Sequence, residues 1–165
     1  MLTHLLFMRH AKSSWADPDM TDHDRPLNAR GRRAATAMGE ALHARGYAPQ
    51  RIWSSDARRT RETAMRLIRA IPGAQHVDYL PDFYHAPASQ AVHVASRLGE
   101  PKDTERLMWL GHNPGWAELH ARFTGRHDDY PTGACTVLSR VGDGDWLSPN
   151  SWRLLDFVLP RELEV

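Results

Sequence analysis

The sequence predicts an α/β protein of three layers, with helices on both faces of a mainly parallel central sheet that has an antiparallel edge. Segments typical of strands and of helices alternate over most of the chain. The apolar run 5–8 has no polar alternation, which is typical of a central strand buried on both faces. Near the carboxyl terminus two further strand-like segments are joined by turn-forming residues. In such folds ligands bind beyond the carboxyl ends of the parallel strands.

Length and charge narrow the class of protein. The chain has 165 residues, so we expect one domain spanning 1–165, with 41% hydrophobic residues as in ordinary globular proteins. The formal net charge of +1 argues against binding to nucleic acid, because such domains usually carry a marked basic excess. Lys12 and Lys102 are the only lysines among 21 basic residues. This use of arginine favours bidentate contacts with carboxylate or phosphate, although an arginine-rich genome would also produce it.

The single cysteine and the hydropathy of the chain bear on its compartment. Cys135 stands alone, which rules out an intrachain disulfide, and its strand-like surroundings predict a small core residue rather than a nucleophile. No segment reaches the roughly 20 apolar residues that a membrane helix needs. The amino terminus also lacks the pattern of a secretory signal peptide. We therefore expect a cytoplasmic protein, monomeric and without a membrane partner.

The first third of the chain predicts a strand, a long connection and a helix. Arg9 and His10 follow the apolar run directly, at the carboxyl end of its strand. Segment 11–28 has no periodicity, and a connection of this length is expected to be a lid or a binding loop, or else disordered. Its four aspartates fit no calcium loop, so we interpret them as solvent-exposed charges. Asn28 is a suitable N-cap and Gly46 a suitable stop for a helix between them. Helical spacing predicts that its buried residues are Ala34, Ala37, Met38, Ala41 and Leu42.

The middle of the chain predicts a short strand over 51–53 and a helix after it. Ser54 or Ser55 would cap this helix, and Pro72 with Gly73 would end it. The apolar candidates for its buried side are Ala57, Ala64, Met65 and Ile68.

The second half continues the alternation. A third strand is expected over 76–80, a helix over 89–98, a buried strand over 106–110 and a helix over 114–123. Strands near 134–140 and 152–159 are expected to form an antiparallel hairpin at one edge of the sheet.

Three polar segments should meet at the carboxyl ends of the strands: MRHAKS, SSDARRTRETA and GHNPG. A guanidinium beside an imidazole suits an anionic phosphate. Each segment also has an ordinary interpretation: His10 as a surface histidine, the helical arginines as solvated charges, and GHNPG as a turn with an N-cap. Their joint occurrence favours a phosphate site.

Five ordered motifs carry a family resemblance: RHAKSSW, DHDRPLNARGRRAA, WSSDARRTRETA, LGHNPGW and YPTGA. In order and approximate spacing the chain resembles the histidine phosphatase superfamily, which is phosphoglycerate mutase-like, and within it the small SixA-type phosphohistidine phosphatases. The resemblance extends from Leu5 to about Pro160 and implies a phosphoglycerate mutase-like fold. One departure is Ala11, where much of the superfamily has glycine and SixA-like members often have alanine.

The resemblance assigns roles to particular residues. It implies that His10 is the nucleophile and Arg9 its neighbouring phosphate ligand, that Arg59 is the second arginine and that His112 is the second catalytic histidine. It also implies that Ser13 and Arg25 are further phosphate contacts.

The chemistry of these residue types agrees with those roles. A neutral imidazole can attack phosphorus and form a phosphohistidine that water hydrolyses, if its other nitrogen keeps a proton. We expect that proton on His10 to face a backbone carbonyl. Protonated His112 would donate to the phosphoryl oxygens, which the two guanidinium groups also bind. No cofactor or metal is expected, since His112, His120 and Glu118 lack zinc-binding spacing.

The possible substrates differ in how much their leaving group needs a general acid. Relatives that act on alkyl phosphates need an acid, and Asp82 is the only carboxylate in the expected loop 80–87, where the match to the family's motif is poor. A departing imidazole needs that acid less, so we favour a phosphate-bearing substrate that is a phosphohistidine protein domain, as in signal transduction. The alternatives are a small-molecule phosphomonoesterase with Asp82 as general acid, and a catalytically quiet module that binds phosphorylated partners. A mutase is less favoured, because no loops are evident that would retain a bisphosphate.

Overall fold

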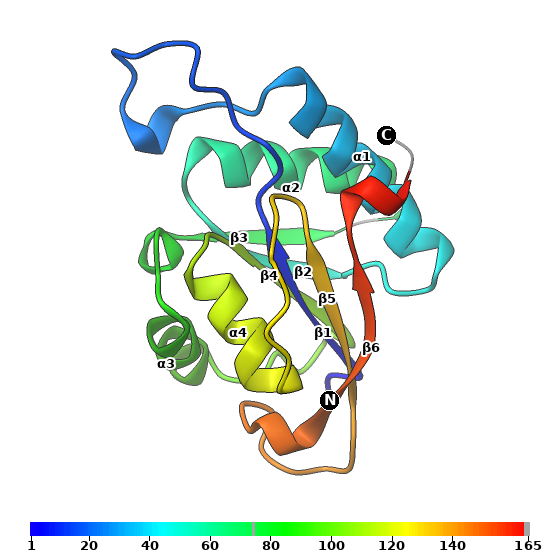
Figure 1. Ribbon diagram of the computed structural model, residues 1–165. Coiled ribbons are helices and arrows are strands. Elements are labelled where there is room, and N and C mark those ends of the chain that lie inside the picture. Colours follow the sequence, from blue (N-terminus) through cyan, green and yellow to red (C-terminus); the bar gives the residue numbers. More distant parts are fainter. Residues whose placement is uncertain (74, 164–165) are drawn as a thin grey trace.

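One six-stranded sheet, in the order β3-β2-β4-β1-β5-β6, forms the middle layer of the protein (Figure 1). The structure is a computed structural model that describes residues 1–73 and 75–163. The strands are β1 (His4–Arg9), β2 (Arg51–Ser55), β3 (His76–Leu80), β4 (Arg106–Gly111), β5 (Cys135–Arg140) and β6 (Trp152–Val158). The helices are α1 (Ala29–Ala44), α2 (Arg58–Ala70), α3 (Ala88–Leu98) and α4 (Gly115–Thr124).

The strand directions confirm the predicted fold class. Strands β1 to β4 pair in parallel, whereas β5 is antiparallel to β1 and β6 is antiparallel to β5. Helices α1 and α2 cover one face of the sheet, and α3 and α4 cover the other (Figure 1). The hairpin of β5 and β6 is the predicted antiparallel edge.

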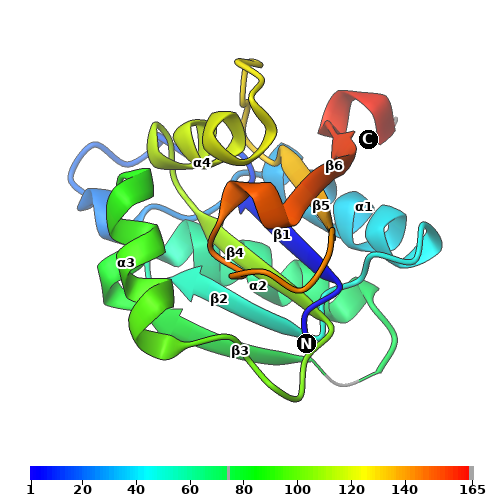
Figure 2. The same ribbon diagram turned by 90° about the horizontal axis from the view of Figure 1, so that it is seen from below.

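Strand β1 lies at the centre of both hydrophobic cores. Leu5 and Phe7 pack in the core under α3 and α4, while Leu6 and Met8 pack in the core under α1 and α2. All four side chains are fully buried, which explains the unbroken apolar run. The strand ends at Arg9, so the next residue emerges at the edge where β2 and β4 also end. The segment after β1 lies beyond this edge (Figure 2).

Helix α1 has the predicted ends but not the full predicted core face. The Asn28 side chain accepts a hydrogen bond from the Gly31 amide at 2.8 Å, and Gly46 follows the helix with a positive φ of 82°. Met38 and Leu42 are buried as predicted, but the three predicted alanines remain partly exposed. The inward positions are instead Gly31, Ala35 and Gly39, because α1 packs too closely against α2 and the Lys12 backbone for larger residues.

Helix α2 corrects the prediction of its cap and its buried side. Its N-cap is Ala57, although the Ser55 hydroxyl accepts a hydrogen bond from the Ala57 amide at 3.2 Å. Met65 is 43% exposed and Ile68 only partly buried. The inward side chains include Arg59, Thr60 and Thr63, so this face is largely polar. Ala57 and Ala64 are fully buried as predicted, so an apolar criterion finds only part of the inward face and misses its polar residues.

The other elements lie within a few residues of their predicted ranges. Cys135 is fully buried, and burial raises the pKa of its thiol, which confirms it as a core residue. None of the helices described here is long and apolar enough to cross a bilayer. The two ends of the long segment after β1 are joined to each other by an antiparallel bridge between Ser13 and Leu27.

Candidate active site

A cavity of about 350 Å³ lies at the carboxyl ends of the central strands. It is built from the segment after β1, the start of α2, the loop after β3 and the turn before α4. The predicted residues Arg9, His10, Ser13, Arg25, Arg59 and His112 all line it, together with Lys12, Trp15, Asp22, His85, Asn113 and Thr132. Three sequence segments that are far apart thus converge as expected.

His10 lies at the floor of this cavity with 6% of its surface exposed. Its Nδ1 lies 2.7 Å from the carbonyl oxygen of Ala11, which can only accept, so Nδ1 carries the proton and Nε2 keeps a lone pair. This contact confirms the expected backbone carbonyl. Burial lowers the pKa of His10 to about 3, helped by the charges of Arg59 and Arg9, although the Ala11 contact opposes the shift. His10 is therefore neutral at physiological pH and can act as a nucleophile.

His112 faces His10, with the two ring centroids 5.3 Å apart. The Arg59 guanidinium donates to Nδ1 at 3.4 Å, so Nε2 carries the proton and donates to the Ser55 hydroxyl at 2.8 Å. Burial and the neighbouring groups His10 and Arg59 lower the pKa of His112 to about 2. A phosphate dianion bound beside this ring would favour its protonated form.

Two arginines that line the cavity each have a donor without a partner in the described part of the chain. Arg59 donates to the carbonyl oxygen of Asp22 at 2.7 Å and to its carboxylate at 3.1 Å. Arg9 donates to the carbonyl oxygen of Tyr130 at 3.0 Å. The Nε atoms of both guanidinium groups are buried and have no partner among the residues described. A buried unpaired donor costs about 1–3 kcal/mol, so both groups favour an anionic ligand that accepts from them.

Arg25 and Ser13 belong to the same wall of the cavity. Arg25 donates to the Ser13 hydroxyl at 3.0 Å and to the Asp22 carboxylate at 3.1 Å. Its guanidinium lies 3.4 Å from the centroid of the Trp15 ring. These contacts fix the planar group at the rim, where it adds positive charge for an anion.

Asp82 does not join the other predicted residues. Its side chain lines a separate pocket of about 230 Å³ with Pro81, Val94 and Leu98, on the outer side of the loop after β3. The same loop presents His85 to the cavity instead. The candidate general acid therefore lies outside the cavity that holds His10.

Asp22 corrects the interpretation of the acidic loop as solvent-exposed charge. Its carboxylate accepts hydrogen bonds from Arg59, Arg25, Tyr84 and His85. Burial by itself would raise the pKa of Asp22, but the hydrogen bonds from Tyr84 and His85 and the charge of Arg59 hold it well below its usual range. Asp22 lies in the motif DHDRPLN together with Asp24, but the resemblance assigns it no role, and its contacts depend on the fold.

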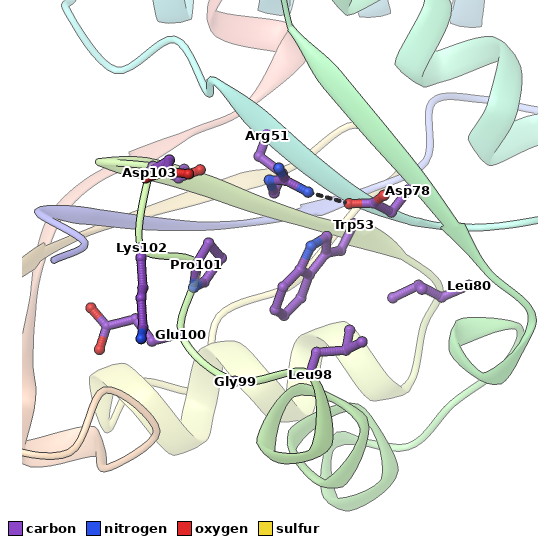
Figure 3. A pocket seen from close by; sticks show the side chains of 11 residues that line it. Arg51, Trp53, Asp78, Leu80, Leu98, Gly99, Glu100, Pro101, Lys102 and Asp103 are labelled. Carbon is purple, nitrogen blue, oxygen red and sulfur yellow. Dashed lines mark hydrogen bonds and ion pairs between the residues drawn. The ribbon is translucent and has the colours of Figure 1, made fainter.

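A larger pocket elsewhere contains none of the predicted site residues. It has a volume of about 370 Å³ and lies beside β2 and β3, where the connection from α3 to β4 closes it (Figure 3). Arg51 donates to Asp78 there at 2.9 Å (Figure 3), while its buried Nε has no partner among the residues described. Across residues 1–73 and 75–163, no group of three or more histidine, cysteine, aspartate or glutamate side chains is arranged to hold a metal ion.

Comparisons with known proteins agree with this geometry. The model of the histidine phosphatase superfamily (branch 1) matches residues 5–84. A protein described as uncharacterised and chloroplastic, from Arabidopsis thaliana, is 34% identical over 94% of this chain and 77% of its own length. An uncharacterised protein of Mycobacterium tuberculosis, Rv1276c, is 30% identical over 93% of this chain and all of its own.

Solved structures give the same result. A structure assigned as the phosphohistidine phosphatase SixA of Agrobacterium tumefaciens has a TM-score of 0.79 and 30% identity, covering 97% of this chain and 99% of that one. The protein histidine phosphatase SixA in complex with tungstate shares the fold, with a TM-score of 0.79 and 16% identity over 97% of this chain and 99% of that one. The chain therefore belongs to the histidine phosphatase superfamily and is of the SixA type.

Proposed function

We propose that this phosphatase hydrolyses phosphohistidine on a protein through a covalent phosphohistidine intermediate on its own His10. The observation that carries the proposal is the position of the proton on the neutral His10 ring. Because Nδ1 donates to the Ala11 carbonyl, Nε2 presents a lone pair to a cavity that contains two incompletely paired guanidinium groups. A nucleophile and the donors for a tetrahedral dianion thus occupy one site.

The reaction proceeds in two displacements. Arg9 and Arg59 bind the phosphoryl oxygens, and Nε2 of His10 attacks phosphorus in line with the leaving nitrogen. The bond from phosphorus to Nε2 forms while the bond to the substrate nitrogen breaks. His112 takes up a proton when the dianion binds and donates to its oxygens as charge develops. Water then attacks the phosphohistidine, and inorganic phosphate leaves with His10 neutral again.

Two observations support a protein phosphohistidine as substrate, and a third supports a phosphoryl group. The Asp82 carboxyl lies outside the cavity, and a departing imidazole depends less on such an acid than an alkoxide does. The connections from β3 to α3 (81–87) and from β4 to α4 (112–114) are short and contain no inserted α-helix, which suits access by a protein. The SixA structure with tungstate holds a tetrahedral oxyanion, the geometry of a phosphoryl group. We further propose that the protein acts in the cytoplasm as a monomer, on a histidine-containing signalling domain, and needs no metal or cofactor.

The two rival functions make different demands on the site. A small-molecule phosphomonoesterase that uses Asp82 would need this carboxyl to reach the leaving group, and it lines another pocket. A quiet binding module would need the guanidinium donors but not an unprotonated Nε2 on His10. A neutral His10 ring with a lone pair on Nε2 therefore favours the enzyme over the binding module.

The test compares wild-type protein with His10→Ala on a phosphohistidine peptide and on a panel of phosphate metabolites. We expect the wild type to release phosphate from the peptide and to form a phosphoenzyme, and His10→Ala to do neither. The control is His76→Ala, an exposed histidine on β3 outside the cavity. Rapid cleavage of small esters with the peptide left intact would contradict the substrate. Tight phosphate binding without turnover in wild type would contradict the enzyme.

A further inference from the structure

His85 occupies the mouth of the active-site cavity in a constrained backbone conformation. Its φ is 51°, in the left-handed region, and among the residues described it is the one such position outside the glycines. Non-glycine residues in this region cluster at functional sites, because the surrounding structure must hold them there. The side chain is 49% exposed, and its ring centroid lies 4.9 Å from that of His112. His85 thus faces the buried histidines from the solvent side.

Close packing against the start of α4 holds the backbone of this loop. A Cβ atom on Gly115 would lie 1.9 Å from the Ala86 carbonyl oxygen, so only glycine allows this approach. Gly115 follows His112 by three residues, and Ala86 follows His85 directly. The contact therefore couples the position of His85 to that of the turn that carries His112.

Asp22 fixes the ring of His85. The Nε2 atom of His85 donates to the Asp22 carboxylate at 2.8 Å, which leaves Nδ1 as the nitrogen that can reach a ligand. The hydrogen bonds from Tyr84 and His85 and the charge of Arg59 hold the pKa of this carboxylate well below its usual range. The ring and the carboxylate thus form a hydrogen-bonded pair at the cavity mouth.

In-line geometry places the leaving group near this ring. His10 is 6% exposed and attacks from the cavity floor, so the departing atom must point away from the floor, toward solvent. Of the groups at the mouth, His85 has the exposure and the chemistry to meet it.

The other nearby groups are less suited to donate a proton. Asp22 is held ionised, and burial together with the hydrogen bond to Asp22 raises the pKa of the Tyr84 hydroxyl. Asp82 lines a different pocket. His10 and His112 are committed to the phosphoryl group. His85 remains.

We propose that His85, oriented by Asp22, donates a proton from Nδ1 to the leaving group as its bond to phosphorus breaks. In the second displacement the neutral ring accepts a proton from the attacking water, which restores the imidazolium. The inference rests on the proposed phosphatase function and applies to a nitrogen or an oxygen leaving group. The titratable or charged groups facing the ring are Asp22 from the segment before α1, Arg59 from α2, His112 from the turn before α4, and the adjacent Tyr84.

The first experiment measures kcat/KM for two aryl phosphates that differ in leaving group, p-nitrophenyl phosphate and phenyl phosphate. Asparagine tolerates the left-handed region, so His85→Asn keeps the backbone and removes the acid. Because general acids contribute roughly 10² to 10⁴ in rate, we expect about a 100-fold loss on phenyl phosphate and less than a tenfold loss on p-nitrophenyl phosphate. An equal loss on both substrates would overturn the proposal.

The control is His76→Asn. His76 also pairs with an aspartate, Asp78 at 3.0 Å, but it is exposed and lies outside the cavity. This variant is expected to match the wild type on both substrates.

A second variant removes the ring and relieves the backbone. His85→Gly should lose activity on phenyl phosphate and regain at least tenfold when free imidazole is added, which a purely structural role would not produce. No rescue, with the folded state intact by circular dichroism, would overturn the proton transfer. If the wild type forms a phosphoenzyme on His10 and neither variant is selective for leaving group, the role of His85 fails alone. If the wild type forms no phosphoenzyme, the proposed function fails.

Discussion

At the scale of single residues, the two cavity histidines are distinguished by their hydrogen-bond partners. A carbonyl oxygen fixes the proton of His10 on Nδ1, whereas the Ser55 hydroxyl and the Arg59 guanidinium fix that of His112 on Nε2. The first ring thus presents a lone pair from Nε2, and the second presents Nδ1, the nitrogen that gains a proton when an anion binds. The motifs identify both histidines but not the groups that orient their rings. Ala11 contributes only its backbone carbonyl. Ser54 and Ser55 are adjacent in one motif, so the sequence does not show which of them contacts His112.

We expect Ser55→Ala to lower kcat about two- to tenfold, because one hydrogen bond of about 0.5–1.5 kcal/mol no longer fixes the His112 ring. The measurement is steady-state turnover of a phosphohistidine peptide, with nitrogen NMR shifts of His112 to report its tautomer. Ser54→Ala is the matched control. Its buried hydroxyl donates to the Ser55 carbonyl, which also accepts from Thr60, so its loss should leave kcat unchanged. Equal effects in the two variants would contradict a role for the Ser55 hydroxyl.

At the scale of elements, the sequence predicts where helices begin and end better than it predicts which face they bury. In α2 the inward side carries Thr63, whose hydroxyl accepts from the Ala11 amide at 3.1 Å and donates to the Arg59 carbonyl at 2.7 Å. This hydroxyl ties the helix to the residue after His10. Burial of these threonine and arginine side chains is tolerated because each makes hydrogen bonds, which the helical periodicity of apolar residues does not report. Met65 is accordingly left on the outer side.

The prediction for an element concerns Gly31, where α1 approaches the Lys12 backbone. A Cβ atom on Gly31 would lie 2.1 Å from the Lys12 carbonyl oxygen, so Gly31→Ala should push the start of α1 away from the segment after His10. We expect a loss of about 1–3 kcal/mol in the free energy of unfolding, as for other overpacked sites, and reduced activity. Alanine by itself favours a helix over glycine by about 1 kcal/mol, so any loss must come from the contact. Urea unfolding measures it, and Arg30→Ala, an exposed neighbour, is the control. Unchanged or increased stability would contradict the close approach.

At the scale of the whole molecule, the alternation of elements predicts the layers, and the apolar run predicts the central strand. What the sequence does not predict is the path of the long segment after β1. The bridge between Ser13 and Leu27 closes this segment into a loop that brings Asp22 and Arg25 to the cavity. The bridge joins two residues of an irregular segment, where no periodicity indicates a pairing. The motifs predicted Arg25 at the site through the family resemblance. Asp22 and His85 follow only from the three-dimensional fold, since each depends on contacts across more than 30 residues of sequence.

The cavity also makes the stability of the whole protein depend on pH. The folded state lowers the pKa of His10 to about 3 and that of His112 to about 2, whereas the unfolded chain binds protons near pH 6.5. Below that pH the unfolded state holds more protons, so stability falls as pH falls from 6.5 toward 3. Between pH 7.5 and 5.0 each histidine should cost about 2 kcal/mol. In His10→Gln the decrease, measured by urea unfolding in phosphate-free buffer, should therefore be smaller than in wild type by about that amount, whereas exposed His76→Gln should follow the wild type. Parallel curves for His10→Gln and wild type would show that the buried imidazole does not resist protonation, and would remove the basis for a neutral nucleophile.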